Sequence, residues 1–324
     1  TCALPILKKL SQYGCEILRL DAFAYLHKQI GESNFFNKPG TWDYLHRIKQ
    51  IATKNNLMLL PEIHAEYGLH LHDEVANEGY PVYDFFLPGL TIHTLENQTS
   101  KALLSWAKEI VAKGFKTVNM LGCHDGIPVL DLKGKEVDGQ YNKGLLDDNE
   151  IEAIMNTIME RGGRVKNLYD PSGKKISYYQ VNATFFSALG EDEQKLLLAR
   201  AIQMFMPGIP QVWYLDLFAG KNNYEAADKG GDAGHKEINR TTLTMADIEQ
   251  GLKTAVVKNQ LAIIRLRNTS NAFLGTVAIK DAFEDTIDIK WTNHTTTAHL
   301  QANLKTYNFT IHHIENGITQ KLSF

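Results

Sequence analysis

Cysteine and long apolar runs are both scarce in this chain. Of its 324 residues only Cys2, Cys15 and Cys123 are cysteines, and they share no CxxC or Cys/His spacing. This pattern argues against a disulfide framework or a structural zinc site and fits a reducing cytoplasm, where we expect the protein. The most apolar stretch, residues 201–215, is interrupted by glutamines and prolines. It falls short of the roughly 20 apolar residues that a membrane-spanning helix needs, so we expect no membrane span.

The chain also lacks an excess of charge of either sign. Its 34 Lys and Arg residues against 37 Asp and Glu residues give a net charge of −3. No basic field is present to hold a nucleic-acid backbone, so nucleic acid is not an expected partner. At 44% hydrophobic and 22% charged residues, the composition predicts a globular protein with a large core. No basic and apolar leader segment can be read at the first residues.

Short apolar runs rich in β-branched and aromatic residues alternate with longer segments of helical spacing. The runs lie at 15–20, 57–61, 82–86, 117–121 and 210–215, and the helical faces at 45–51, 103–110 and 196–205. Runs that are apolar throughout are typical of parallel strands buried on both faces. We therefore predict repeated βα units, with helices that cover a parallel sheet.

The spacing of apolar residues changes after Arg267. Segments of period two at 277–279, 287–291, 298–304 and 309–314 predict a small antiparallel β-domain. We therefore predict two domains, 1–270 and 271–324. Within the first, the polar stretch 126–177 holds a predicted helix at 147–159 and is too long for a simple connection. It is either an insertion over an active face or a tolerated surface loop.

Ionisable side chains follow three of the predicted strands. They lie in Arg19-Leu20-Asp21, Pro61-Glu62-Ile63-His64 and Cys123-His124-Asp125. In a parallel βα barrel these tips share the face on which active sites are built. Retaining glycosidases need two carboxylates about 5–5.5 Å apart, one as nucleophile and one as acid/base. The three tips together favour such chemistry.

Each tip suggests a role for its side chains. Strand periodicity puts Arg19 and Asp21 on one side, where the guanidinium can hold the carboxylate ionised as a nucleophile. Taken alone, the tripeptide favours a structural ion pair at a strand end. Glu62 follows an apolar run with no cation immediately beside it, and an apolar surrounding would favour the protonated acid. Asp125 could stabilise positive charge on the sugar ring while His124 donates to a hydroxyl.

Other readings of the same residues stay open. Glu62, His64, His124 and Asp125 could be metal ligands, but no HExxH-type spacing supports this, and we expect no metal. Segment 230–234 lacks the strand and helix context of a dinucleotide site, so no cofactor is expected.

Three more side chains are candidates for contact with a ligand. Tyr179 and Gln180 could contact a sugar or could simply be packed in a strand. Arg240 could contact a ligand, bridge to a carboxylate or lie on the surface.

The sequence resembles the α-amylase superfamily of retaining glucoside enzymes and, within it, the sucrose phosphorylase branch. The similar blocks are YGCEILRLDAFAY at 13–25, LPEIH at 60–64, VYDF at 82–85, CHDGI at 123–127, YQVNAT at 179–184, GIPQ at 208–211, AGKN at 219–222 and INR at 238–240. Three of them match catalytic regions. The resemblance implies that Asp21 is the nucleophile, Glu62 the acid/base and Asp125 the transition-state stabiliser. It implies that Arg19 and His124 are sugar-binding neighbours, and that the loop with Tyr179 and Gln180 helps to choose between fructosyl and phosphate occupancy.

The resemblance also implies a reaction. We expect a retaining α-glucosyl transfer from sucrose or a similar glucoside to inorganic phosphate, without a cofactor, in an enzyme that could form a homodimer. Ser177 stands where sucrose-specific members commonly have an acidic residue, and loop 228–237 is longer than usual. Both departures lie on the acceptor side, which leaves fructose, a phosphorylated fructose or another polyol open as leaving group.

Several alternatives remain at this stage. The same carboxylates would serve a hydrolase or a transglucosidase, or a phosphorylase of sucrose 6′-phosphate or glucosylglycerol. The expected fold is a (β/α)8-type barrel followed by the antiparallel domain. The chain begins just before what resembles the fourth barrel strand, so three strands are expected to be missing, and an inactive fragment is a further alternative.

Overall fold

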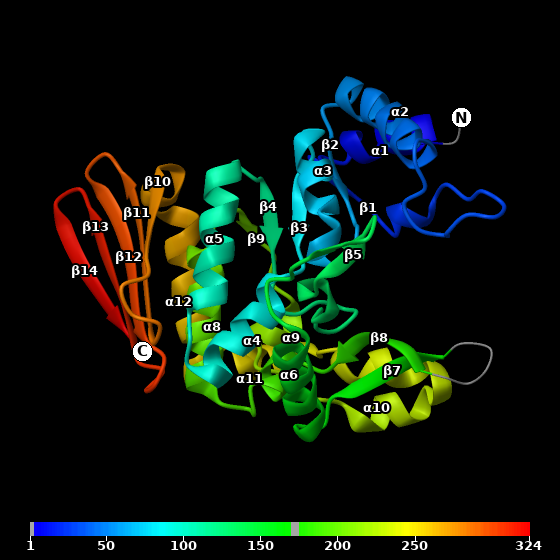
Figure 1. The fold of residues 1–324 in the computed structure, drawn as a ribbon. Coiled ribbons are helices and arrows are strands. Elements are labelled where there is room, and N and C mark those ends of the chain that lie inside the picture. The colour runs from blue at the N-terminus through cyan, green and yellow to red at the C-terminus, as the bar shows by residue number, and fades with distance from the viewer. Residues whose placement is uncertain (1–2, 170–174) are drawn as a thin grey trace. The chain divides into compact units, whose positions relative to one another are not determined.

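The computed structural model describes the backbone of residues 3–169 and 175–324 (Figure 1). The side chains of 3–4, 166–169, 175–180 and 232–233 lie outside the described part. The chain divides into two compact units. The first comprises 1–65, 70–83 and 115–118, and the second comprises 66–69, 84–114 and 119–324. The predicted domains, 1–270 and 271–324, are a different division of the chain and remain a prediction.

The first unit contains helices around two parallel strands. Its elements are α1 (Ala3–Gln12), β1 (Ile17–Leu20), a short 3-10 helix (Phe23–Tyr25), α2 (Gly40–Lys54), β2 (Met58–Pro61) and α3 (Leu71–Asn77). Strand β1 pairs with β2 in parallel, with Ile17 opposite Met58 and Leu20 opposite Pro61. Leu45 of α2 packs with Leu57, Leu59 and other buried side chains into the core of this unit. The predicted helical face at 45–51 is thus confirmed.

The unit boundary passes through strands β3 (Val82–Asp84) and β4 (Thr117–Asn119). With β9 (Ile209–Pro210) they form a sheet in the order β3-β4-β9. The predicted strand 210–215 was mostly wrong: pairing is limited to residues 209–210, and a helix starts at Tyr214. Pro210 has no N–H to donate to a ladder, which limits this strand, and Gln211 donates the next bond to the Asn119 carbonyl at 2.8 Å.

The helices of the second unit are mostly short. They are α4 (Leu87–Asn97), α5 (Lys101–Lys113), α6 (Asp148–Glu160), α7 (Phe185–Ala188), α8 (Glu193–Phe205), α9 (Tyr214–Leu217), α10 (Tyr224–Lys229), α11 (Met245–Gly251) and α12 (Ala255–Thr269), with 3-10 helices at Tyr67–Leu69, Leu130–Leu132, Gly231–Asn239 and Asn271–Leu274. The predicted faces at 103–110 and 196–205 lie in α5 and α8, whose inward residues are buried. Both predictions are confirmed.

The polar stretch 126–177 has regular structure of its own. It contains the hairpin of β5 (Lys135–Val137) and β6 (Gln140–Asn142), helix α6, strand β7 (Arg164–Tyr169) and the start of β8 (Lys175–Asn182). Helix α6 starts one residue after the predicted position, because Asp147 caps it. The Asp147 side chain accepts from the Glu150 N–H at 2.9 Å, and the Glu150 carboxylate accepts from the Asp147 N–H at 2.8 Å.

A five-stranded antiparallel sheet follows α12, where the sequence predicted it; its strands run from orange to red in Figure 1. The strands are β10 (Thr276–Lys280), β11 (Thr286–Asn293), β12 (Thr296–Asn303), β13 (Phe309–Glu315) and β14 (Ile318–Ser323). Inward residues such as Ile289, Leu300 and Ile311 form one buried cross-strand row. Strand β14 was not predicted, because this edge strand is largely exposed and lacks alternating apolar residues.

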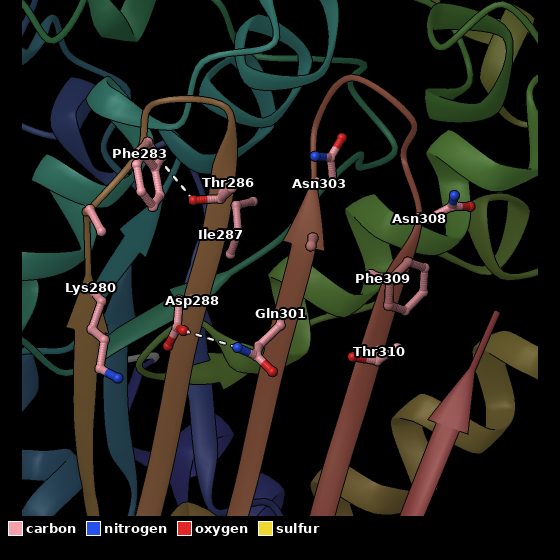
Figure 2. A pocket seen from close by; sticks show the side chains of 12 residues that line it. Lys280, Phe283, Thr286, Ile287, Asp288, Gln301, Asn303, Asn308, Phe309 and Thr310 are labelled. Carbon is pink, nitrogen blue, oxygen red and sulfur yellow. Dashed lines mark hydrogen bonds between the residues drawn. The ribbon is translucent and has the colours of Figure 1, made fainter.

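A cavity of about 480 Å³ opens at one end of this sheet, between the loop that carries Phe283 and strands β11 to β13 (Figure 2). Asp288 is the one carboxylate in its lining. It accepts hydrogen bonds from Gln301 at 3.3 Å and contacts the His299 ring at 2.8 Å. A cavity with one carboxylate already engaged by its neighbours does not supply the two carboxylates of the predicted chemistry.

Among the residues that the structure describes, none of the helices combines the length and apolar character needed to cross a membrane. The longest described helices, α2 and α12, have 15 residues each and carry charged side chains.

Asp84, at the end of β3, is a fully buried carboxyl group without a cation beside it. Its Oδ1 accepts from Trp106 Nε1 and from the N–H groups of Phe86 and Leu87 at 3.0 to 3.2 Å. Burial raises the pKa of Asp84 to about 6, although these hydrogen bonds act to lower it. The ionised form therefore opposes folding; its cost begins above the unfolded pKa and is complete above the folded pKa.

We expect Asp84→Asn to remove this cost. The unfolded pKa is about 3.9, so the unfolding free energy of the native protein should fall as pH rises from about 4 to 6, by up to roughly 3 kcal/mol. The variant should therefore gain stability relative to the native protein between pH 4.5 and pH 7. Urea unfolding of the full natural chain, native and variant, at pH 4.5 and at pH 7 measures this gain, with the exposed Asp148→Asn as control. An equal difference in unfolding free energy between variant and native protein at the two pH values would contradict the raised pKa of Asp84.

Candidate active site

One guanidinium joins two carboxylates at the ends of β1 and β2. Arg19 Nη1 lies 2.7 Å from Asp21 Oδ1, and Arg19 Nη2 lies 2.6 Å from Glu62 Oε1. The parallel register explains the meeting, because Leu20 and Pro61 are partners and the two acids follow directly after them. The Glu62 N–H extends the pairing by donating to the Leu20 carbonyl at 3.0 Å. The structure thus brings together three residues that the sequence predicted for the site.

The two carboxylates differ in exposure. The Asp21 side chain is 74% exposed, whereas that of Glu62 is 11% exposed. The Ala22 N–H donates to Glu62 Oε2 at 2.9 Å, which holds the Glu62 carboxylate in place on its second oxygen. Asp21 is therefore the acid open to a ligand, and Glu62 is the acid held by its surroundings.

The predicted surrounding of Glu62 was wrong. The sequence places no cation next to it, but the fold puts Arg19 at 2.6 Å and His64 Nε2 at 3.8 Å. Burial acts to lower the pKa of Arg19, but attraction and hydrogen bonding from Glu62, with smaller contributions from Tyr83 and Asp21, raise it overall. Arg19 is thus a permanent cation in direct contact with both acids.

Asp125 of the second unit lies among three basic side chains. Its Oδ1 is 2.5 Å from Lys236 Nζ and 3.2 Å from Arg240 Nη2, and its Oδ2 is 3.2 Å from His124 Nε2. Burial acts to raise the pKa of Asp125, but Lys236, His124 and Arg240 lower it overall. The carboxylate is held ionised, as a group that stabilises positive charge must be.

The backbone around Asp125 is fixed by side chains from distant segments. Asn182 Nδ2 donates to the Asp125 carbonyl at 2.7 Å, Arg240 Nε to the His124 carbonyl at 2.8 Å, and Asn239 Nδ2 to the Cys123 carbonyl at 2.7 Å. Gly126 has a φ of 112°, and a Cβ there would lie 2.5 Å from the Val181 carbonyl oxygen. Only glycine fits this position, so the CHDG turn is built for this backbone path.

The remaining predicted residues stand as follows. The structure places Arg240 on the Asp125 carboxylate and on the backbone of His124, so of its three readings the bridge to a carboxylate is the one observed. Tyr179 and Gln180 belong to strand β8, but their side chains lie outside the described residues.

The four residues of the alternative metal site belong to different units. Glu62 and His64 lie in the first unit, and His124 and Asp125 lie in the second, so neither unit by itself supplies more than two of the four groups.

Sequence reasoning missed Lys236 as a site residue. It lies 111 residues from Asp125, on the 3-10 helix Gly231–Asn239, and its side chain is 26% exposed. The one signal was the unusual length of loop 228–237, which singles out the segment but not the lysine. Pairing over such a separation depends on the fold and leaves no trace in local spacing.

We expect Lys236→Met to raise the pKa of Asp125, because the variant removes the closest cation without removing the length of the side chain. Carboxyl NMR of 13C-labelled aspartate in the full natural chain measures the titration, and the signal lost in Asp125→Asn assigns it. The midpoint should rise, because the carboxylate loses its closest positive charge. Lys229→Met, at an exposed pair with Glu225, serves as control. An unchanged midpoint in Lys236→Met would show that the ion pair does not hold Asp125 ionised.

Curated proteins of known activity match nearly the whole chain. Sucrose 6(F)-phosphate phosphorylase from Ilumatobacter coccineus is 56% identical over 317 residues, which are 98% of this chain and 60% of that protein. Sucrose phosphorylase from Streptococcus mutans is 35% identical over 98% of this chain and 63% of that protein. The chain thus spans about three fifths of the length of the curated relatives it matches. No family model matches it.

The solved structures agree with the sequence matches. The crystal structure of sucrose 6F-phosphate phosphorylase from Thermoanaerobacter thermosaccharolyticum shares 34% identity and superimposes with a TM-score of 0.87, covering 99% of this chain and 63% of that one. The structural neighbours are α-amylase-family proteins, which have a (β/α)8 barrel and a C-terminal β-domain. These matches and the blocks around Asp21, Glu62 and Asp125 show that the chain is related to the sucrose phosphorylase branch of the α-amylase superfamily.

Proposed function

We propose that the full natural chain is a retaining α-glucosyl phosphorylase that uses Asp21 and Glu62 as its reacting carboxylates. The main support for the proposal is the position of the Arg19 guanidinium. Its nitrogens lie 2.7 Å from Asp21 Oδ1 and 2.6 Å from Glu62 Oε1. Retaining chemistry needs a nucleophile and an acid/base on neighbouring positions, and the parallel pairing of β1 and β2 supplies them.

The first half of the reaction breaks the glucosidic bond. Asp21 attacks the anomeric carbon while Glu62 gives its proton to the leaving oxygen, forming a β-glucosyl ester on Asp21. The exposed Asp21 side chain suits a nucleophile that must meet substrate. Arg19 favours the carboxylate that Glu62 becomes after it has given up its proton. The Asp125 carboxylate stabilises the positive charge that develops on the glucosyl ring.

The second half returns the enzyme to its resting state. Inorganic phosphate attacks the anomeric carbon of the glucosyl ester and gives its proton to Glu62; the bond from this carbon to Asp21 breaks, which frees the Asp21 carboxylate and yields α-glucose 1-phosphate. Two inversions at the same carbon give net retention. Water in place of phosphate would make the same residues a hydrolase, and another sugar would make them a transglucosidase.

We propose sucrose 6F-phosphate as the preferred substrate, with sucrose as the second candidate. The 56% identical relative is named for the phosphorylated sugar, whereas the 35% identical one is named for sucrose. The acceptor-side departures at Ser177 and in loop 228–237 support a leaving group other than plain fructose. Loop 228–237 also supplies Lys236, a cation beside the proposed transition-state stabiliser.

We further propose that this chain corresponds to the C-terminal three fifths of such an enzyme. On this proposal the first three barrel strands belong to sequence outside the 324 residues, and activity requires them. We propose a cytoplasmic location and an assembly that could include a homodimer. The small-molecule partners are the glucoside and inorganic phosphate, without a metal or organic cofactor in the reaction.

A product assay on the full natural chain tests the function. With phosphate and either sucrose 6F-phosphate or sucrose, we expect α-glucose 1-phosphate, formed faster from the phosphorylated sugar. Asp21→Asn should lower the rate by at least about a thousandfold, because the nucleophile is lost. The exposed Asp43→Asn on α2 is the matched control and should retain the native rate. Free glucose formed at a rate independent of phosphate would show a hydrolase instead.

A further inference from the structure

Two histidines and an aspartate converge at the start of α3. His70 Nδ1 lies 3.2 Å from Asp73 Oδ2, and His72 Nε2 lies 3.7 Å from the same oxygen. One donor atom from each of the three residues lies within 4.8 Å of the others. The sequence HLHD has none of the common zinc spacings, so the group is visible only in the fold.

The distances fit a small tetrahedral ion. Zinc binds imidazole nitrogen and carboxylate oxygen at about 2.0–2.2 Å, which makes the edge between two ligand atoms of a tetrahedron about 3.3–3.6 Å. The observed edges of 3.2 and 3.7 Å bracket this value. The third edge, between the two imidazole nitrogens, is within 4.8 Å, and the two rings would have to approach each other wherever it exceeds the tetrahedral value.

The local structure presents the three donors from one turn. His70 precedes α3 with a φ of 55°, and Asp73 follows it in an i, i+3 relation. The His72 side chain is 6% exposed and stands edge-on to Phe115 with ring centroids 6.0 Å apart, which fixes its orientation. The His70 side chain is 43% exposed, so an ion can reach the group from solvent.

We propose that His70, His72 and Asp73 form a binding site for a divalent transition-metal ion of the Zn²⁺ type. Two imidazoles and one carboxylate suit zinc, with water as the fourth ligand, whereas Mg²⁺ and Ca²⁺ prefer six or more oxygen ligands. Each imidazole binds through its lone pair, and any proton that it carries on that nitrogen passes to solvent.

The ion would stabilise the segment that follows Glu62. A cation at a helix N-terminus is disfavoured by the helix dipole, but Asp73 and Glu74 in the first turn of α3 offset this. Val75 of the same helix belongs to the core of the first unit. Metal binding at His70 to Asp73 would therefore tie the loop after β2 to the core, outside the proposed catalytic group.

Metal binding to the full natural chain tests the proposal. After removal of metals with a chelator, isothermal titration with Zn²⁺ should show a site that His70→Ala and Asp73→Asn each weaken at least tenfold. His46→Ala, at an exposed pair with Glu78 in the same unit, should bind like the native protein. X-ray absorption of the bound zinc should report nitrogen and oxygen ligands that include two imidazoles.

Thermal unfolding provides a second readout. Zn²⁺ should raise the melting temperature of the native chain and of His46→Ala, but not of His70→Ala or Asp73→Asn, and Mg²⁺ should have no such effect. Circular dichroism checks that the variants are folded. Equal Zn²⁺ affinity in all the variants, absence of the site in the native chain, or equal stabilisation by Mg²⁺ would overturn the proposal.

Discussion

The arrangement of the candidate site depends on a single shared cation. Two carboxylates at the ends of neighbouring strands would repel each other, and Arg19 relieves this by contacting both, at 2.7 Å for Asp21 and 2.6 Å for Glu62. The guanidinium can do so because it has several donors in a rigid fork, which an ammonium group lacks. The parallel pairing of β1 and β2 fixes the relation between the three groups, so the fold contributes the register and the arginine contributes the charge.

Two fully buried acids are held in a different way. Burial raises the pKa of Asp84 and of Asp216 to about 6, even though Arg200 attracts Asp216. Both serve as acceptors for backbone N–H groups, as in the bonds from Gly122 and Phe185 to Asp216 at 3.1 and 3.3 Å. Asp125, by contrast, has three basic neighbours and a lowered pKa. Direct ion pairs therefore distinguish Asp125 from these two acids.

The sequence predicted the elements better than their environments. The apolar runs located β1 to β4, and helical spacing located α2, α5 and α8, because burial on one or both faces leaves a periodic trace. The edge strand β14 and the short β9 were missed or misread, because exposed edge strands and proline-containing ends carry no such trace.

The candidate site was predictable in its acids and in the Arg19–Asp21 pair, but not in the cation beside Glu62 or in Lys236. Asp21, Glu62 and Asp125 each follow an apolar run, so position along the chain reveals them. The neighbours of Glu62 and Asp125 come from elsewhere: Arg19 lies on the adjacent strand, and Lys236 lies 111 residues from Asp125. Contacts of that kind depend on strand register and loop path, which local spacing does not encode.

In the proposed mechanism Asp21 forms a covalent bond with glucose. Reacting the full natural chain with a fluorinated glucosyl donor that slows the second step, followed by mass spectrometry of its peptides, measures this directly. We expect one glucosyl adduct on the peptide that contains Asp21, released when phosphate is added. An adduct on Glu62 or on Asp125, or turnover of the donor with inversion and no adduct, would contradict it.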